Sequence, residues 1–373
     1  MSDIAIFCDG SWNSPDQPFP TSVFRLHQAL KAQATDGIKL FYDPGVGVRE
    51  PDDPEYTWWE EFSGGALGAG LTKNIADCYR ALIDLYAPGD RIHIFGFSRG
   101  AYTARSLAGL LRNCGLPSTP DHVDAALAWY RRRDPASHPG SASSHAFRAQ
   151  ISPRVHTSSE EAAWRRAQGI DTGDPMHLAY LGIYDTVGAH GIAGVLGQFR
   201  RVAPGGHGFH DHDLSSLVRS GRHAMALDET RVLYRPTPWA NLARLNADAL
   251  EAGAATPPYL QQWFPGSHSK VGGSGEDRQI SNRVLDWVFA GSVAAGLPAA
   301  PLTDPDLALA DGDHLGPLHN PSSGFDITGL LRFGRRGPAP FDEDALHPVA
   351  QRRVADDASY RPASLRRLLL SRR

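Results

Sequence analysis

The chain has 373 residues, of which 41% are apolar and 21% are charged, and its formal net charge at pH 7 is −4. This length allows one large domain or two small ones, and the composition excludes a chain that is disordered throughout. A chain with this charge balance lacks the basic surface on which nucleic-acid binding depends, so nucleic acid is excluded as a partner.

The cysteines and the N-terminus point to a reducing compartment. Cys8, Cys78 and Cys114 are too few and too far apart for a disulfide framework or a four-thiolate zinc site. The first ten residues show no secretory signal, and the most apolar long stretch, residues 288–302, is shorter than the roughly 20 residues that span a bilayer. We expect a cytoplasmic protein without a transmembrane segment, exported if at all by a signal-peptide-independent route.

Apolar runs alternate with amphipathic stretches along the first 300 residues. Such alternation is typical of βαβ units, in which helices cover both faces of a parallel sheet. The pattern predicts strands at residues 4–8, 39–42, 91–97, 177–184 and 232–234, and helices at residues 21–34, 99–113 and 282–290 and after a cap at Thr72. The predicted class is therefore α/β, with a mainly parallel sheet.

Two regions interrupt this alternation. Residues 131–161 are rich in Ser, Pro, His and Arg, and we expect an exposed insertion that lies over the active face or is partly disordered. Beyond residue 297 the chain is rich in Pro and Gly and ends in a basic stretch. We predict a catalytic domain over residues 1–297 and, over residues 298–373, an extension packed on it or trailing from it. The basic end is either a solvated helix or tail or a contact with an anionic surface or partner.

The strongest local motif is Gly96-Phe97-Ser98-Arg99-Gly100, which lies between a predicted strand and a predicted helix. A Gly-x-Ser-x-Gly turn in this context places the serine on a strained nucleophile elbow, because the flanking glycines remove Cβ atoms that would clash. Ser98 is the predicted nucleophile, and the amide of Arg99 is a predicted oxyanion donor at the helix N-terminus. The alternative is a strand-to-helix turn without catalysis.

A serine nucleophile needs a base and an acid that orients the base. Asp185 follows the strand predicted at residues 177–184, where such folds collect active groups, and His268 follows an apolar run in a glycine-containing loop. This order of Ser, Asp and His along the chain is typical of α/β-hydrolases. Asp185 could instead be a turn aspartate. Weaker alternatives are Asp213 and Asp228 for the acid, and His190 and His223 for the base.

A second oxyanion donor should come from the loop after an early strand. The turn after residues 4–8 offers the amides of Gly10 and Ser11. The alternative is a strand-ending turn in which Asp9 bonds its own backbone.

Two other patterns predict neither a cofactor nor a metal. The run Gly65, Gly68 and Gly70 lacks the residues of a phosphate-binding motif and favours a tight loop. A hydrated loop is favoured where histidine and aspartate cluster, since adjacent residues rarely converge on one ion. This cluster comprises His207, His210, Asp211, His212 and Asp213.

Motifs spread over most of the chain occur in the order found in one family. They are residues 7–13, 42–47, 68–71, 74–75, 96–105, 184–188, 223–229 and 263–269. Through them the chain resembles the DUF2235 family of α/β-hydrolases, which includes the Tle1-type phospholipase effectors of bacterial type VI secretion. The family pattern has an aspartate two residues after the histidine, where this chain has Lys270.

The resemblance implies a serine esterase or lipase, with Ser98 as nucleophile, Asp185 as acid and His268 as base. The expected substrate is a carboxylic ester, and a phospholipid or another lipid-like ester fits the family. If the protein is a secreted effector, an immunity or delivery partner is also expected. The rival hypotheses are a catalytically silent binding module that keeps the fold, and metal-dependent hydrolysis through the His/Asp cluster.

Overall fold

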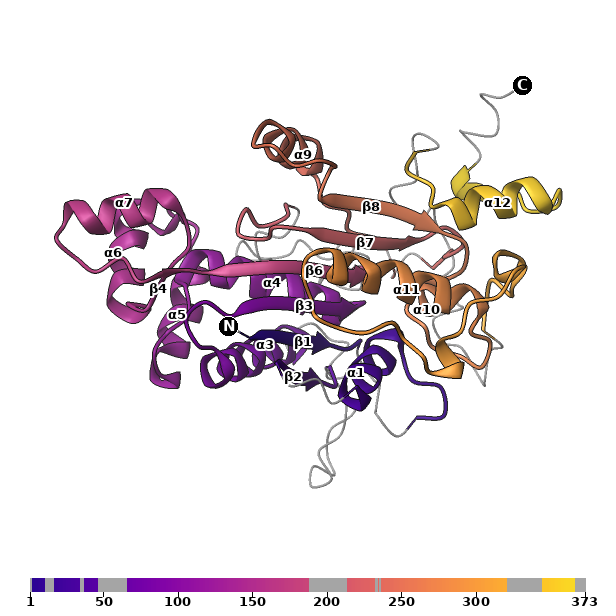
Figure 1. The fold of residues 1–373 in the computed structure, drawn as a ribbon, viewed down its shortest axis with the longest axis horizontal. Helices are drawn as coiled ribbons and strands as arrows, with labels where there is room; N and C mark the ends of the chain where they lie inside the picture. Colours follow the sequence, from indigo (N-terminus) through magenta and orange to yellow (C-terminus); the bar gives the residue numbers. More distant parts are fainter. Residues whose placement is uncertain are drawn as a thin grey trace.

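The computed structural model describes residues 2–10, 17–33, 37–45, 66–187, 213–231, 234, 236–320 and 344–365, with the backbone alone for residues 66–69. Its centre is a sheet of six strands in the order β2-β1-β3-β6-β7-β8, and every neighbouring pair is parallel (Figure 1). The strands are β1 (Asp3–Cys8), β2 (Ile38–Asp43), β3 (Arg91–Phe97), β6 (His177–Tyr184), β7 (Gly221–Ala226) and β8 (Tyr259–Phe264).

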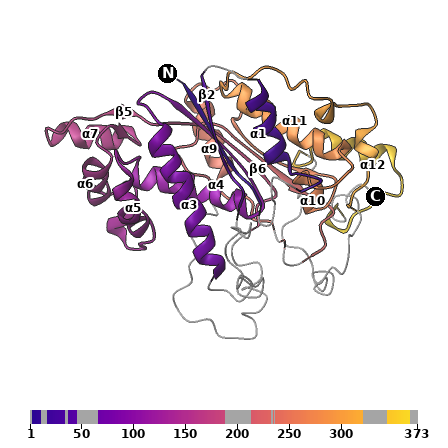
Figure 2. The same ribbon diagram turned by 90° about the horizontal axis from the view of Figure 1, so that it is seen from below.

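Helices pack on both faces of this sheet, as Figure 2 shows. Alternate side chains of β1 point to opposite faces, so Ile4 and Ile6 belong to one core cluster and Ala5 and Phe7 to another. The first core includes residues from α3 (Ala66–Leu85), α4 (Arg99–Cys114) and α5 (Val123–Tyr130), and the second includes residues from α1 (Ser22–Ala32) and α11 (Gln279–Ala294). The fold is therefore an α/β-hydrolase-like one, as the sequence predicted.

The register brings the ends of several strands to one edge. Phe97 pairs with Tyr184, Tyr184 with Ala224, and Ala226 with Phe264. The residues that follow β3, β6 and β8 in the chain therefore emerge side by side at the carboxyl edge of the sheet. The short helix α10 (His268–Val271) lies at this edge.

The predicted strands at residues 4–8, 39–42, 91–97 and 177–184 are confirmed, whereas other predictions need correction. The helix predicted to begin after Thr72 begins at Ala66, so Thr72 lies inside it. β7 and β8 were not predicted as strands, because Arg222, Gln261 and Gln262 interrupt their apolar pattern. Of the strand predicted at residues 232–234, residues 232 and 233 lie outside the described part of the chain.

The segment 131–161 is folded, against the expectation of partial disorder, although many of its side chains are exposed. It contains α6 (Ala142–Ile151) and β4 (Val155–His156), and α7 (Ser159–Ala167) begins within it. β4 pairs with β5 (Asp174–Pro175), the residues that lead into β6. α6 and α7 lie beyond the amino ends of the strands, at the opposite end of the molecule from α10 (Figure 1). The insertion therefore does not lie over the carboxyl edge.

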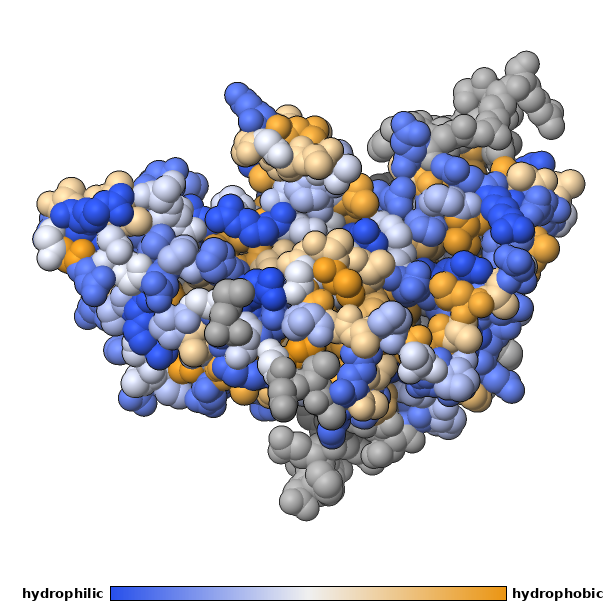
Figure 3. All heavy atoms as spheres, in the orientation of Figure 1, coloured by the Kyte–Doolittle hydropathy of each residue, from blue (hydrophilic) through white to orange (hydrophobic). Residues whose placement is uncertain are grey.

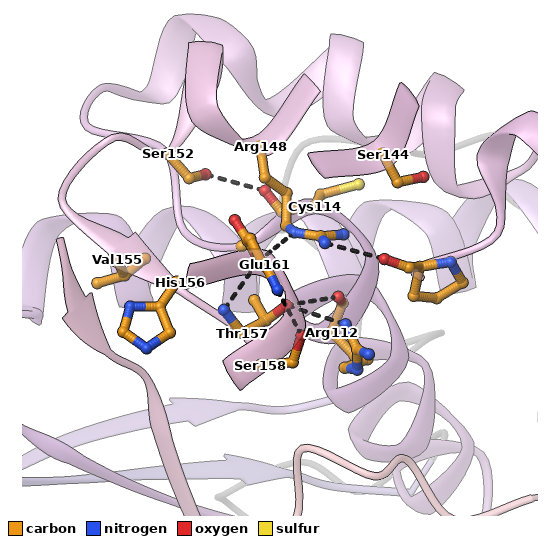
Figure 4. A network of polar contacts seen from close by, with 12 residues as sticks. Arg112, Cys114, Ser144, Arg148, Ser152, Val155, His156, Thr157, Ser158 and Glu161 are labelled. Carbon is orange, nitrogen blue, oxygen red and sulfur yellow. Dashed lines mark hydrogen bonds and ion pairs between the residues drawn. The ribbon is translucent and has the colours of Figure 1, made fainter. Parts of the chain in front are cut away.

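Buried charge explains why this segment folds without a visible apolar period. The side chains of Arg148, Glu161 and Arg165 are fully buried. Glu161 pairs with Arg148 (Nε–Oε2, 2.6 Å) and accepts hydrogen bonds from the amide and hydroxyl of Thr157, both at 3.0 Å (Figure 4). It also pairs with Arg165 (Nη2–Oε1, 2.6 Å). Arg148 also donates to the carbonyl of Asn113, which ties the insertion to the end of α4.

The C-terminal residues pack on the edge strand β8. α12 (Pro348–Asp356) follows a parallel bridge between Trp263 and Leu346, and Trp263 lies in a small core with Leu346 and Tyr360. On the other side of β8, α9 (Leu242–Glu251) projects from the body and carries apolar side chains at its surface (Figure 3). The remaining short elements are 3₁₀ turns at Pro120–His122, Pro135–Ser137, Pro305–Leu307, Asp313–Leu315 and Ala363–Leu365.

Candidate active site

Ser98 occupies the sharp turn between β3 and α4. Its backbone angles are φ 57° and ψ −119°, a conformation that side chains other than glycine rarely adopt. A Cβ atom at Gly96 would lie 2.6 Å from the carbonyl oxygen of Gly100, and one at Gly100 would lie 2.1 Å from that of Cys8. Both positions therefore require glycine, and the turn that they permit places the Ser98 side chain at the carboxyl edge.

Asp185 follows the neighbouring strand β6 and is fully buried. It too has a positive φ, 34°. Its amide donates to the carbonyl of Ala224 at 2.7 Å, and its Oδ1 accepts the amide of Ala226 at 2.9 Å. These bonds to β7 fix the carboxyl group and leave Oδ2 directed toward the third residue of the site.

His268 joins the two. Its Nδ1 lies 2.7 Å from Asp185 Oδ2, and its Nε2 lies 2.8 Å from Ser98 Oγ. Both distances are those of strong hydrogen bonds. With Nδ1 donating to the carboxylate, Nε2 is left as an acceptor for the Ser98 proton. The exposed fraction of Ser98 is 8% and that of His268 is 4%, so the bonds lie at the border between core and solvent.

Neighbouring groups hold the imidazole in this position. Its ring packs against the rings of Phe97 and Tyr234, with both centroid separations 4.7 Å. The amide of His268 donates to Glu229 Oε2 at 3.3 Å, and Glu229 forms two hydrogen bonds with the Arg231 side chain, of 2.9 and 2.7 Å. Although burial alone would raise the pKa of Glu229, the bonds and charge of Arg231 lower it.

Of the two oxyanion donors predicted in the turn after β1, the structure describes Gly10. The Gly10 amide donates to Asp9 Oδ1 at 2.7 Å, while Asp9 Oδ2 accepts the hydroxyls of Thr21 (2.7 Å) and Tyr42 (2.8 Å). Burial raises the pKa of Asp9 to about 7, and these three bonds oppose the rise. The Gly10 amide is thus directed to Asp9. Ser11 lies outside the described residues.

The weaker candidates occupy other positions. His223 is buried in β7, where its Nε2 accepts the Thr186 amide at 3.3 Å and its Nδ1 lies 3.1 Å from Gln261 Oε1. Asp228 accepts the Gly266 amide at 2.6 Å. Asp213 is exposed, and His190, with residues 207–212 of the predicted His/Asp cluster, lies outside the described part of the chain.

Lys270, which stands where the family pattern has an aspartate, has a structural role in this protein. It is fully buried, and its ammonium group donates to the carbonyl of Asp277 at 3.0 Å and pairs with its Oδ1 at 3.3 Å. Burial lowers the pKa of Lys270, and the Asp277 charge opposes this effect. The lysine therefore fastens the turn after α10, while Ser98 and Asp185 both reach His268 without it.

The described part of the chain contains neither a metal-binding cluster nor a membrane-spanning helix. Among those residues no group of three or more His, Cys, Asp or Glu side chains is arranged to hold a metal ion. None of the helices described is long and apolar enough to cross a membrane.

Fold and geometry together define a class: an α/β-hydrolase-like protein with a serine on a strained strand-to-helix turn. Residues 2–291 match the model of the Tle1-like catalytic domain of phospholipase effectors of the type VI secretion system. The chain belongs to this family. It is also 25% identical over 232 residues to the uncharacterized protein YEL023C of Saccharomyces cerevisiae, a stretch that covers 60% of this chain and 30% of the yeast protein.

Three solved structures are similar at low identity. An uncharacterized protein from Pseudomonas aeruginosa is 18% identical, with a TM-score of 0.41, over 83% of this chain and 47% of its own. The Tle1 effector bound to the VgrG spike of the type VI secretion system is 15% identical (TM-score 0.35), over 73% of this chain and 50% of its own. Acyl-protein thioesterase 2 of Zea mays is 12% identical (TM-score 0.31), over 78% and 93%. The chain thus spans about half of the first two.

The groups that hold the histidine are not evident from the sequence. Asp228 was considered only as an acid, and Glu229 was not assigned a role, although both lie in the segment 223–229 that resembles the family. The available signal was the position of this acidic pair directly after β7, at the edge where the active groups collect.

Proposed function

We propose that this protein is a serine hydrolase that cleaves carboxylic esters through Ser98, His268 and Asp185. One observation carries the proposal: a single imidazole bridges the Ser98 hydroxyl, at 2.8 Å, and a buried carboxylate, at 2.7 Å. The strained elbow under Ser98 supports it, because such strain persists where a fold holds a reactive group in place.

In the acylation step, His268 Nε2 takes the Ser98 proton while Oγ attacks the ester carbonyl carbon. Asp185 holds the imidazole in the tautomer that leaves Nε2 unprotonated and stabilises the imidazolium that forms. The carbonyl oxygen becomes an oxyanion, for which the amide of Arg99 at the N-terminus of α4 is the proposed donor. The tetrahedral intermediate then collapses, and the imidazolium protonates the departing alkoxide.

Deacylation repeats these steps with water. His268 removes a proton from the water as it attacks the acyl-enzyme, and it returns that proton to Ser98 Oγ when the acid leaves.

A second oxyanion donor from the turn after β1 would have to be Ser11, or Gly10 with its amide turned away from Asp9.

The family supports a lipid-like ester, with a phospholipid as the leading substrate. A Tle1 effector has been solved bound to the VgrG spike. By extension we propose that this protein leaves the cytoplasm through a type VI route, and that it meets a delivery partner and an immunity partner.

The direct test is labelling with a fluorophosphonate probe. Wild type should be labelled, Ser98→Ala should not, and Ser292→Ala should be labelled like wild type, because Ser292 is a buried serine whose hydroxyl bonds the carbonyl of Phe289 in α11. A folded wild type that stays unlabelled would favour the catalytically silent module.

A substrate panel separates the remaining hypotheses. Wild type and Ser98→Ala are compared on short-chain esters and on phospholipid vesicles, each with and without a chelator. Serine hydrolysis predicts activity that is lost with Ser98 and unaffected by the chelator. Activity that survives in Ser98→Ala and disappears with the chelator would favour a metal-dependent reaction.

A further inference from the structure

The family match ends at residue 291, yet the chain beyond it reaches back to the turn that carries His268. We call residues 298–320 and 344–365 the C-terminal segment. Several hydrogen bonds join this segment to β8 and to the turn between β8 and α10. The Ser267 amide, next to His268, donates to the carbonyl of Leu318 at 2.8 Å, and the Trp263 amide donates to that of Ala345 at 2.8 Å.

Asp228 is the central link between this segment and the turn. Its Oδ2 accepts the Gly266 amide at 2.6 Å and the Tyr360 hydroxyl at 2.8 Å. Its own amide donates to the Gly266 carbonyl at 3.1 Å, so the two backbones are joined in both directions. Gly266 has a φ of 108°, which only glycine adopts freely, and it lies two residues before His268.

Tyr360 is itself held firmly. Its ring is 5% exposed and packs with Leu227, Trp263 and Leu346, and the Arg353 guanidinium lies 4.9 Å from its centroid. A ring fixed in this way presents its hydroxyl at one place. The hydrogen bond to Asp228 therefore transmits the rigidity of the C-terminal core to the turn.

We propose that Tyr360 is a positioning residue: through Asp228 it fixes the β8–α10 turn and so keeps the His268 ring between Ser98 and Asp185. This inference rests on the proposed function for its effect on rate. If Tyr360 has this role, the C-terminal segment contributes to the activity of the hydrolase. Tyr360 reaches His268 only through Asp228 and the turn, so its loss should lower kcat and leave KM unchanged.

The test is Tyr360→Phe, which keeps the ring and removes the hydroxyl. The matched control is Tyr259→Phe, at the other end of β8, where the hydroxyl donates to the Val218 carbonyl at 2.8 Å. The loss of a single hydrogen bond corresponds to a roughly three- to tenfold change in an equilibrium. We expect kcat for a short-chain ester to fall about three- to tenfold in Tyr360→Phe and to stay near wild type in the control.

Amide hydrogen exchange of residues 262–272 gives a readout that needs no activity. Exchange there should be faster in Tyr360→Phe than in wild type and unchanged in Tyr259→Phe. In an Asp228→Ala background, the further change to Tyr360→Phe should have no effect on either readout, because both variants remove the same link.

The outcomes separate the two proposals. An inactive wild type whose turn still exchanges faster in Tyr360→Phe overturns the proposed function and keeps the positioning role. An active enzyme in which Tyr360→Phe changes neither kcat nor exchange overturns the positioning role. A Tyr360→Phe effect that persists undiminished in the Asp228→Ala background also overturns it.

Discussion

The molecule buries ionic groups at both ends of its sheet, and the two networks are built differently. At the carboxyl edge, Asp185 accepts the Ala226 amide and pairs with the His268 imidazole. At the opposite end, Glu161 accepts from the guanidinium groups of Arg148 and Arg165 and from the amide and hydroxyl of Thr157, and Figure 4 shows Glu161 with Arg148 and Thr157. The first network leaves a bond that can change during a reaction. The second is saturated and can only hold the fold together.

The backbone shows the same contrast. Ser98 and Asp185 are the two residues other than glycine with a positive φ in the described part of the chain, and both belong to the carboxyl-edge site. α6 and α7, which carry Arg148 and Glu161, are ordinary helices whose first turns are capped by Ser141 and Ser158. Strain is therefore concentrated where chemistry is proposed, and the other end relies on relaxed geometry.

The largest expected effect is that of Asp185→Asn. The amide would donate to His268 Nδ1 and force the proton onto Nε2, which could then no longer accept the Ser98 proton. We expect kcat to fall by on the order of 10⁴-fold.

The matched control is Asp3→Asn, at the amino end of β1, where Asp3 Oδ1 lies 3.0 Å from the buried His93 Nε2. This variant should lose stability and keep its rate of ester hydrolysis. A comparable loss of kcat in both variants would mean that any buried Asp–His pair matters equally, and the contrast between the two ends would fail.

Glu161→Gln should have the next largest effect, on folding. It leaves Arg148 and Arg165 buried without a compensating charge, which costs about 3–5 kcal/mol in the free energy of unfolding. The control Asp134→Asn, in the same insertion, alters an exposed pair with Arg132 and should change stability by less than about 0.5 kcal/mol. Urea unfolding measures both. Protein that remains folded should still react with the fluorophosphonate, since the insertion lies away from Ser98.

The sequence predicted those elements whose signal is local, such as a continuous apolar run or a short motif. β3 and β6 are nearly continuous apolar runs, and Ser98 follows from a short motif whose glycines are required by contact with neighbouring backbone. Asp185 and His268 could be proposed because each follows a strand or an apolar run, although their meeting is a property of the folded sheet.

Other features could not be found in this way, because the partner that stabilises them is far away in the chain or hidden. Arg148 and Glu161 look like surface residues until the fold buries them together. His223 in β7 is satisfied by the Thr186 amide and by Gln261 of β8, so neither strand shows a clean apolar period. Tyr360 acquires its role only when the C-terminal segment lies against Asp228.

The ion-pair network around Glu161 should also make the stability of the protein depend on pH. Burial would raise the pKa of Glu161, but the Arg148 charge, the Thr157 amide and Arg165 together lower it below the ordinary value of 4.5. A carboxyl with a lowered folded-state pKa stabilises the fold above its unfolded pKa, and this contribution is lost as the pH falls through the folded value.

We therefore expect the stability difference between wild type and Glu161→Gln to be full at pH 6 and to shrink below about pH 4.5, by about 1.4 kcal/mol for each unit by which the pKa is lowered. Urea unfolding from pH 3 to 6 measures it. A difference that grew on acidification would show that the carboxylate is not stabilised by its partners.

The smallest expected effect is the difference in stability between a glycine and an alanine variant at the same position. This difference should have opposite signs at the strained turn and in α6. Ser98→Gly and Ser98→Ala both remove the hydroxyl, but at φ 57° only glycine is relaxed, so we expect the glycine variant to be more stable by about 1 kcal/mol. Within α6, Ser144→Gly should be less stable than Ser144→Ala by about 1 kcal/mol, because glycine is a poor helix former. Unfolding free energies of the four variants decide this. If alanine were preferred at both positions, the elbow would carry no strain, and the fold would hold Ser98 without cost.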